Sequence, residues 1–254
     1  MADGDRRGQS VQAVVLDLGH TIIDFGPAED ALRDTYVRVL ALLTGRARAE
    51  LPSAEGMVQG VSRRIVAAIN ESYLREELEE LDILTLFDSS LRELGFHLDA
   101  ATVRQIAVLE HRALASGEVL PAENLAAIRH LKAQGLKLGL VSNVTLLPEM
   151  MREDMERLGL LEYFDVTVFS SEEMVRKPHP RIYQAALTRL GVPAVGAVFV
   201  GDRLKEDVRG PKEVGMRAVL TRQFRQEDPH DAAVPPDAVI ASLGELPAVL
   251  AQWA

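Results

Sequence analysis

The feature that most constrains the fold is a regular alternation of short apolar segments with helical segments from about residue 119 onward. The apolar segments cover residues 136–141, 166–169, 197–200, 217–220 and 238–240. The helical segments between them end at Gly135, Gly159, Gly191 and Gly215. Glycine at such positions is typical of helix C-caps. Strands that alternate with helices indicate a parallel sheet with helices on both faces, so the sequence predicts an α/β fold.

A further strand is expected much earlier, at about residues 12–17, and a long helical block separates it from the other strands. Within residues 28–116, apolar residues such as Val61, Ile65 and Ile69 recur at helical spacing, and no convincing strand is present. We therefore interpret this block as an insertion between the first strand and the rest of the sheet. We expect a core domain of residues 11–25 and 117–254, a helical cap of residues 26–116, and a loose tail at residues 1–10.

Composition excludes several classes of function. The chain has 254 residues, 47% of them hydrophobic, and a net charge of -10, which argues against nucleic acid as a partner. It has no cysteine, which excludes thiolate metal sites and thiol catalysis. No apolar run is long enough to cross a membrane and the N-terminus lacks a signal-peptide core, so a cytoplasmic location is expected.

Polar residues with catalytic potential follow several of the predicted strands. Asp17 ends the apolar run 13–16, Ser142 and Asn143 follow the strand at 136–141, and Asp202 follows the strand at 197–200. Ligands of open parallel sheets bind at the carboxyl ends of the strands, so these side chains should meet at one edge. Two such carboxylates, with Lys177 between them in sequence, suggest a nucleophilic carboxylate beside a divalent metal.

Four segments, taken in order, resemble the motifs of the haloacid dehalogenase superfamily, a group of mostly Mg²⁺-dependent phosphatases. The segments are Asp17 to Thr21, Leu138 to Asn143, Arg176 to Tyr183, and Gly201 to Asp207. The resemblance extends from about residue 12 to residue 221. It implies a Rossmann-like parallel sheet with helices on both faces and an inserted all-helical C1-type cap between the first two motifs.

The resemblance also implies a nucleophile and a metal site. Asp17 is expected to attack phosphorus and form an aspartyl-phosphate. Mg²⁺ is the expected cofactor, held by Asp17, Asp202, the backbone carbonyl of Gly19, and Asp207 as a ligand or as a residue that orients one. Magnesium prefers oxygen ligands of these kinds.

The remaining motif residues are expected to bind the phosphoryl group. Thr21 and Ser142 would donate hydrogen bonds to its oxygens, and Lys177 would neutralise charge between it and Asp17. Asn143 would orient the substrate or the nucleophile. Phosphoryl transfer depends mainly on positioning and charge stabilisation, so this set is sufficient.

Position 19 departs from the family pattern. Most phosphatases of the family carry a second aspartate there, which protonates the leaving oxygen, whereas this chain has Gly19. General acid–base help is worth roughly a hundred- to ten-thousand-fold. Its loss should matter most for basic leaving groups. His20 is the nearest titratable replacement, and the hypothesis that it supplies the acid–base function rests on adjacency alone.

Three functions remain open on the sequence. The leading prediction is a Mg²⁺-dependent hydrolase of small phosphorylated metabolites, as a monomer or homodimer. A 2-haloacid dehalogenase also uses an aspartate nucleophile and often lacks the second aspartate, but it needs no metal, so Asp202 and Asp207 count against it. The third is a weak or inactive family member that binds a phosphorylated ligand or a protein partner, for which Gly19 is the argument. A phosphomutase is disfavoured because that chemistry depends on the missing acid.

Overall fold

The computed structural model describes residues 10–44 and 51–253, so most of the expected N-terminal tail lies outside the described residues. These residues form two compact units. The sheet unit comprises the chain up to Phe25, Val119–Val144, and the chain from Met155 onward. The helical unit comprises Gly26–Glu118 and Thr145–Asp154. Each unit is described separately below.

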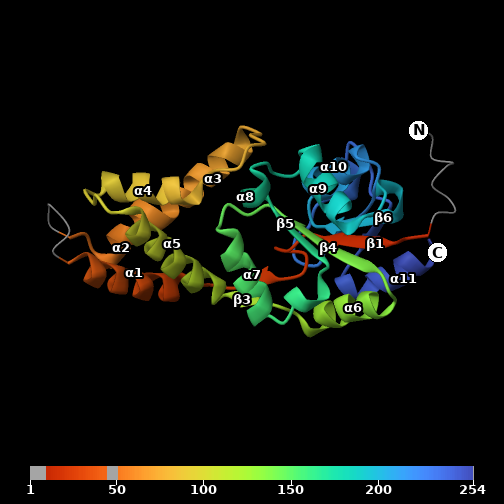
Figure 1. Cartoon of the computed structure of the whole chain (residues 1–254), viewed down its shortest axis with the longest axis horizontal. Coiled ribbons are helices and arrows are strands. Elements are labelled where there is room, and N and C mark those ends of the chain that lie inside the picture. The colour runs from red at the N-terminus through yellow and green to blue at the C-terminus, as the bar shows by residue number, and fades with distance from the viewer. Residues whose placement is uncertain (1–9, 45–50, 254) are drawn as a thin grey trace. The chain divides into compact units, whose positions relative to one another are not determined.

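The sheet unit contains a six-stranded parallel sheet. Its strands are β1 (Ala13–Leu16), β4 (Lys137–Ser142), β5 (Val166–Phe169), β6 (Ala197–Gly201), β7 (Arg217–Thr221) and β8 (Ala238–Ile240). They lie in the order β5-β4-β1-β6-β7-β8, and each neighbouring pair is parallel. Figure 1 labels the first four of these strands. β1 and β6 are buried along their whole length, which explains their unbroken apolar sequence. The predicted α/β class with a parallel sheet is confirmed.

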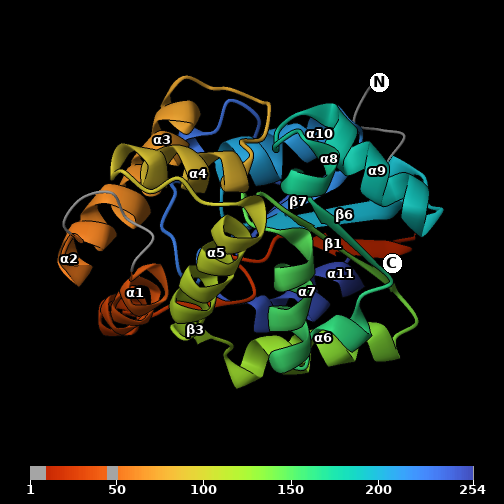
Figure 2. The ribbon, with the colours of Figure 1, turned by 60° about the vertical axis from the view of Figure 1, so that its left-hand side comes forward.

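Helices cover both faces of this sheet. The helices of the unit are α6 (Ala122–Ala133), α8 (Ser170–Glu173), α9 (Pro180–Leu190), α10 (Gly210–Glu213) and α11 (Leu246–Ala251). α9 and α10 lie on one face and α6 and α11 on the other (Figures 1 and 2). α8 directly follows β5, and α10 directly follows a π-helical turn formed by Leu204–Arg209.

Two further strands, β2 (Asp24–Phe25) and β3 (Glu118–Val119), pair in a separate two-stranded sheet. β2 follows the tight turn after β1. In that turn the N–H of Ile22 donates a hydrogen bond of 2.8 Å to the carbonyl of Leu18. The turn therefore brings Thr21 back toward the end of β1.

The helical unit has its own hydrophobic core. Its elements are α1 (Glu29–Leu43), α2 (Ala54–Met57), a π-helical turn (Val58–Arg63), α3 (Arg64–Leu74), α4 (Ile83–Glu93), α5 (Ala100–Ala115) and the first part of α7 (Pro148–Arg157). α5 packs against both α1 and α4. Ser53, Asp82 and Asp99 cap the helices that follow them by accepting a backbone N–H. In the described part of the chain, no helix is long and apolar enough to span a membrane.

The helical unit also includes a segment that the sequence assigns to the core domain. Thr145–Asp154 clusters with the helical unit rather than with the sheet unit. Leu146 and Leu147 pack against the hydrophobic core of the helical unit, and Asp154 pairs with the buried His111 of α5. These long-range contacts explain the difference, because nothing in the local pattern of the segment indicates them.

Candidate active site

The candidate site forms where three neighbouring strands end. Asp17 follows β1, Ser142 is the last residue of β4, and Asp202 follows β6. β1 lies between β4 and β6, with Leu16 paired to Leu140 and to Val200. Because the strands are parallel, their carboxyl ends share one edge of the sheet. The topology therefore brings together residues that lie more than a hundred positions apart.

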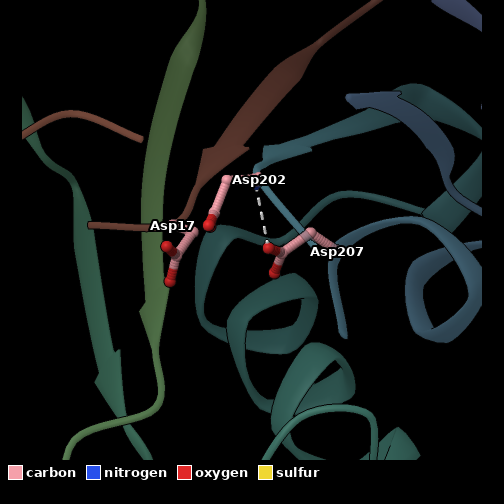
Figure 3. Close-up of side chains that lie close together, drawn as sticks. All are labelled: Asp17, Asp202 and Asp207. Carbon is pink, nitrogen blue, oxygen red and sulfur yellow. Dashed lines mark hydrogen bonds between the residues drawn. The ribbon is translucent and has the colours of Figure 1, made fainter. Parts of the chain in front are cut away.

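Three aspartates meet at this edge. Asp17, Asp202 and Asp207 each offer a carboxylate oxygen, and these oxygens all lie within 4.8 Å of one another (Figure 3). All three side chains are buried. Three buried carboxylates this close repel one another and require cations. Their oxygens are the ligand type that hard divalent cations prefer.

Lys177 supplies one of these cations. Its Nζ atom lies 2.6 Å from Oδ1 of Asp17 and 2.7 Å from Oδ1 of Asp207. Burial lowers the pKa of Lys177, but the two carboxylates outweigh this effect and hold the pKa above its ordinary value. The ammonium is therefore charged and fixed between the predicted nucleophile and Asp207.

Asp207 also fixes the backbone of the loop that follows β6. Its Oδ2 atom accepts hydrogen bonds from the N–H groups of Asp202, at 3.1 Å (Figure 3), and Arg203, at 3.0 Å. A Cβ atom on Gly201 would lie 2.3 Å from Cγ of Asp207, so only glycine fits there. Burial raises the pKa of the Asp207 carboxyl, and the charge of Lys177 opposes this increase. Asp207 thus positions both Asp202 and Lys177.

Thr21 connects the two ends of the cluster. Its hydroxyl oxygen lies 3.3 Å from Oδ2 of Asp17 and 3.4 Å from Oδ1 of Asp202, and the side chain is fully buried. The backbone beside it is held by Asn124 of α6, whose Nδ2 donates to the carbonyl of Ile22 at 2.8 Å. No sequence pattern marks Asn124, because a single asparagine in an amphipathic helix carries no recognisable signal.

Asn143 makes its side-chain hydrogen bonds with the backbone of Lys177. Its Oδ1 atom accepts the N–H of Lys177 at 2.7 Å, and its Nδ2 atom donates to the carbonyl of Lys177 at 3.1 Å. Both ends of the amide therefore hold the backbone from which the Lys177 side chain extends. Ser142, beside it at the end of β4, is buried at the same edge of the sheet.

Gly19 and His20 form the outer part of the turn after β1. A Cβ atom on Gly19 would lie 3.0 Å from Cε2 of Phe25, so the phenyl ring lies where an aspartate side chain would begin. His20 adopts a positive φ of 57° and its Nδ1 atom lies 3.0 Å from Oδ1 of Asp24. Its ring meets that of Phe25 edge to face at 5.2 Å. The contacts of His20 are thus with β2.

Arg225 is a second residue that the sequence analysis missed. Its Nε atom donates to Oδ2 of Asp202 at 2.5 Å. Arg225 lies in the long loop after β7, and β7 pairs with β6, the strand that precedes Asp202. No motif marks this arginine in a loop rich in Pro and Asp, and only the strand order brings it to the site.

The chain is similar in sequence to known phosphatases. Residues 11–215 match the haloacid dehalogenase-like hydrolase family. A glyceraldehyde 3-phosphate phosphatase from Methanopyrus kandleri is 29% identical over 192 residues, which cover 70% of this chain and 81% of the relative. A phosphoserine phosphatase from Thermus thermophilus is 35% identical over 122 residues, 48% of this chain and 47% of the relative, so the match spans about half of that protein.

Solved structures show the same fold. A 2-haloacid dehalogenase from Pseudomonas syringae pv. Tomato DC3000 has a TM-score of 0.70 at 25% identity, covering 96% of this chain and all of the other. A HAD phosphatase from Thermococcus onnurineus has a TM-score of 0.63 at 24% identity, over 94% of this chain and 98% of the other. The sequence match over most of the chain and the shared sheet architecture show that this protein belongs to the haloacid dehalogenase-like hydrolase family.

Proposed function

We propose that the protein is a Mg²⁺-dependent phosphomonoester hydrolase that works through an aspartyl-phosphate on Asp17. The observation that carries the proposal is the cluster of Asp17, Asp202 and Asp207 with Lys177 buried between two of them. A dehalogenase needs the nucleophile but has no use for a complete set of metal ligands. The cluster is therefore better explained by phosphoryl transfer.

The residues present fit a magnesium ion. Asp17, Asp202 and the carbonyl of Gly19 would hold it, with Asp207 close enough to share it, and all of these donors are hard oxygen ligands. When bound, the ion supplies positive charge that offsets the repulsion between the Asp17 carboxylate and a phosphate dianion. The excess of carboxylates at the site favours such a cation.

The chain's own groups then perform the transfer. Asp17 attacks phosphorus as the bond to the leaving oxygen breaks, and water then hydrolyses the aspartyl-phosphate to release inorganic phosphate. Lys177 and the hydroxyls of Thr21 and Ser142 stabilise the charge that develops on the phosphoryl oxygens. Asn143 acts through its two hydrogen bonds to the backbone of Lys177, which fix the position of the backbone that carries the ammonium group. The site is pre-organised, because Lys177 is already in contact with the nucleophile before substrate binds.

The absence of a carboxylate at position 19 points to substrates whose leaving groups need little protonation. Aryl phosphates, acyl phosphates and anhydrides belong to this class, whereas simple alkyl phosphates should react slowly. His20 stays a candidate for partial compensation. Its ring is oriented by Asp24, and His20→Ala with unchanged kcat and an unchanged pH–rate profile would remove it from the mechanism.

The relatives suggest small phosphorylated metabolites as substrates. The two phosphatases compared above are named for glyceraldehyde 3-phosphate and for phosphoserine. Both molecules are small alkyl phosphates. We propose for this protein a substrate of similar size whose leaving group needs less protonation.

A 2-haloacid dehalogenase is the second candidate, favoured by Gly19 and by the fold likeness to the Pseudomonas enzyme. The deciding experiment measures hydrolysis of p-nitrophenyl phosphate with Mg²⁺, with EDTA, and by Asp17→Asn. Asp30→Asn, an exposed carboxylate of α1, is the matched control. Turnover that requires both Mg²⁺ and Asp17 supports the phosphatase. Metal-independent release of chloride from chloroacetate would support the dehalogenase, and a folded, Mg²⁺-binding protein without turnover would indicate a binding protein.

A further inference from the structure

Arg225 pairs with a residue of the proposed metal site, and the proposed reaction so far gives it no role. Asp202 is 2% exposed, and each of its oxygens lies beside a polar group of the protein. Thr21 lies beside Oδ1, and the Arg225 guanidinium donates to Oδ2. The Arg225 side chain is 33% exposed, so one side of it faces solvent while Nε contacts Asp202.

The loop on both sides of Arg225 is tied to the sheet unit. Before it, Gln223 accepts the N–H of Leu243 at 3.1 Å. After it, Glu227 accepts the N–H of Leu204 at 2.6 Å, close to Asp202 itself. The chain is therefore anchored by side chains two residues before and two residues after Arg225, which keeps the guanidinium within reach of Asp202.

The ion pairs of the site form two groups, one around each cation. Lys177 contacts Asp17 and Asp207, and Arg225 contacts Asp202. A divalent cation that binds Asp202 competes with the guanidinium for the same carboxylate and is repelled by it. An anion bound beside the metal is attracted by the guanidinium, whose remaining N–H donors suit phosphate oxygens. Arg225 therefore weakens the binding of the cation and strengthens the binding of the anion.

We propose that Arg225 is an exchangeable counter-cation of the metal site. It neutralises Asp202 in the metal-free protein and binds the phosphoryl group of the substrate when Asp202 holds the metal. This inference rests on the proposed function, because it requires a metal at Asp202. The loop that contains Arg225 lies outside the four motifs, and in this proposal it adjusts the affinity for the metal relative to the affinity for the substrate.

The test is calorimetric and needs no turnover. MgCl₂ is titrated into metal-free full-length wild type, Arg225→Gln, Arg225→Lys and Arg222→Gln, and inorganic phosphate is then titrated at saturating Mg²⁺. Arg222 is the matched control, because it is exposed and lies in the same loop. Asp202→Asn tests the metal site itself. Thermal unfolding of each variant checks that it is folded.

We expect Arg225→Gln to bind Mg²⁺ roughly three- to tenfold more tightly and phosphate more weakly by a similar factor, as for a partly exposed charge pair. Arg225→Lys keeps the charge and should bind Mg²⁺ nearly as wild type does, and Arg222→Gln should change neither affinity.

Equal or weaker Mg²⁺ binding by Arg225→Gln would overturn the role of Arg225 alone. An equal change of Mg²⁺ affinity in Arg222→Gln would also overturn the role of Arg225, because the net charge of the loop would then be the cause. Wild type that binds no Mg²⁺, or binding that survives Asp202→Asn, would instead overturn the metal site on which the proposed function depends.

Discussion

Replacing Gly19 by aspartate should restore the acid that the first motif lacks. The carbonyl of residue 19 stays in place, so the proposed metal ligand is kept. General acid–base catalysis contributes roughly a hundred- to ten-thousand-fold, or about 3 to 5 kcal/mol of barrier. We expect Gly19→Asp to raise kcat for an alkyl phosphate such as glycerol phosphate by this factor and to change kcat for p-nitrophenyl phosphate far less.

The same substitution should lower stability, because Phe25 must move. The new Cβ atom would lie 3.0 Å from Cε2 of the ring, and Phe25 is 48% exposed, so the ring can turn outward. Full burial of phenylalanine is worth roughly 1.5 to 3 kcal/mol, so exposing the buried half costs about 1 kcal/mol. Loss of the edge-to-face contact with His20 adds about 0.5 to 1.5 kcal/mol. We expect urea unfolding of Gly19→Asp to show a loss of about 1.5 to 2.5 kcal/mol.

Two further variants separate these effects. Gly19→Ala introduces the same Cβ atom without a carboxylate, so it should lose stability and gain no rate. In a Phe25→Ala background, Gly19→Asp should cost little stability, because the ring it displaces is absent. If alkyl phosphate turnover stays at the wild-type level in Gly19→Asp and also in Gly19→Asp/Phe25→Ala, the missing carboxylate does not limit this enzyme and the reasoning is refuted.

Three other substitutions test the packing of charges. Lys177→Met leaves two buried carboxylates without their cation. In urea unfolding with EDTA it should lower the free energy of unfolding by about 3 to 5 kcal/mol, and Mg²⁺ should restore part of this loss. An unchanged unfolding midpoint would contradict the buried ion pairs. Gly201→Ala should reduce Mg²⁺ affinity and cost about 1 to 3 kcal/mol, whereas Gly244→Ala, whose Cβ meets only ordinary contacts, should change neither. Burial raises the pKa of Glu110, so the stabilising effect of the protonated carboxyl is present at acid pH and is lost as pH rises through the folded-state pKa. Glu110→Gln should therefore gain thermal stability relative to wild type as pH increases. A difference that does not change with pH would show that Glu110 stays ionised.

Much of the sheet unit could be predicted because its strands are buried on both faces. The apolar runs that end at Asp17 and Asp202 are visible in the sequence, and parallel pairing then places both residues at one edge. The same logic failed for Asn124 and Arg225. Neither follows an apolar strand, and each reaches the site through contacts that depend on strand order or helix packing.

The role of Asn143 shows a different limit. Its position after β4 was predictable, but its partner is the backbone of Lys177, 34 residues later. Spacing indicates that a side chain reaches the site but not which atom there it binds. The division of α7 is a similar case, because Leu146 and Leu147 look like ordinary helix-flanking residues until their contacts with the helical core are known.

The central position of β1 has a consequence for how the chain acquires activity during synthesis. β1 is made first, yet Ala13 pairs with Lys137 and Ala197. The contacts among α1, α4 and α5 are much closer in sequence and can form earlier. The strand that precedes Asp17 therefore stays unpaired until its neighbours β4 and β6 have been synthesised. This exposure makes β1 the segment most prone to misassociation in a nascent or truncated chain.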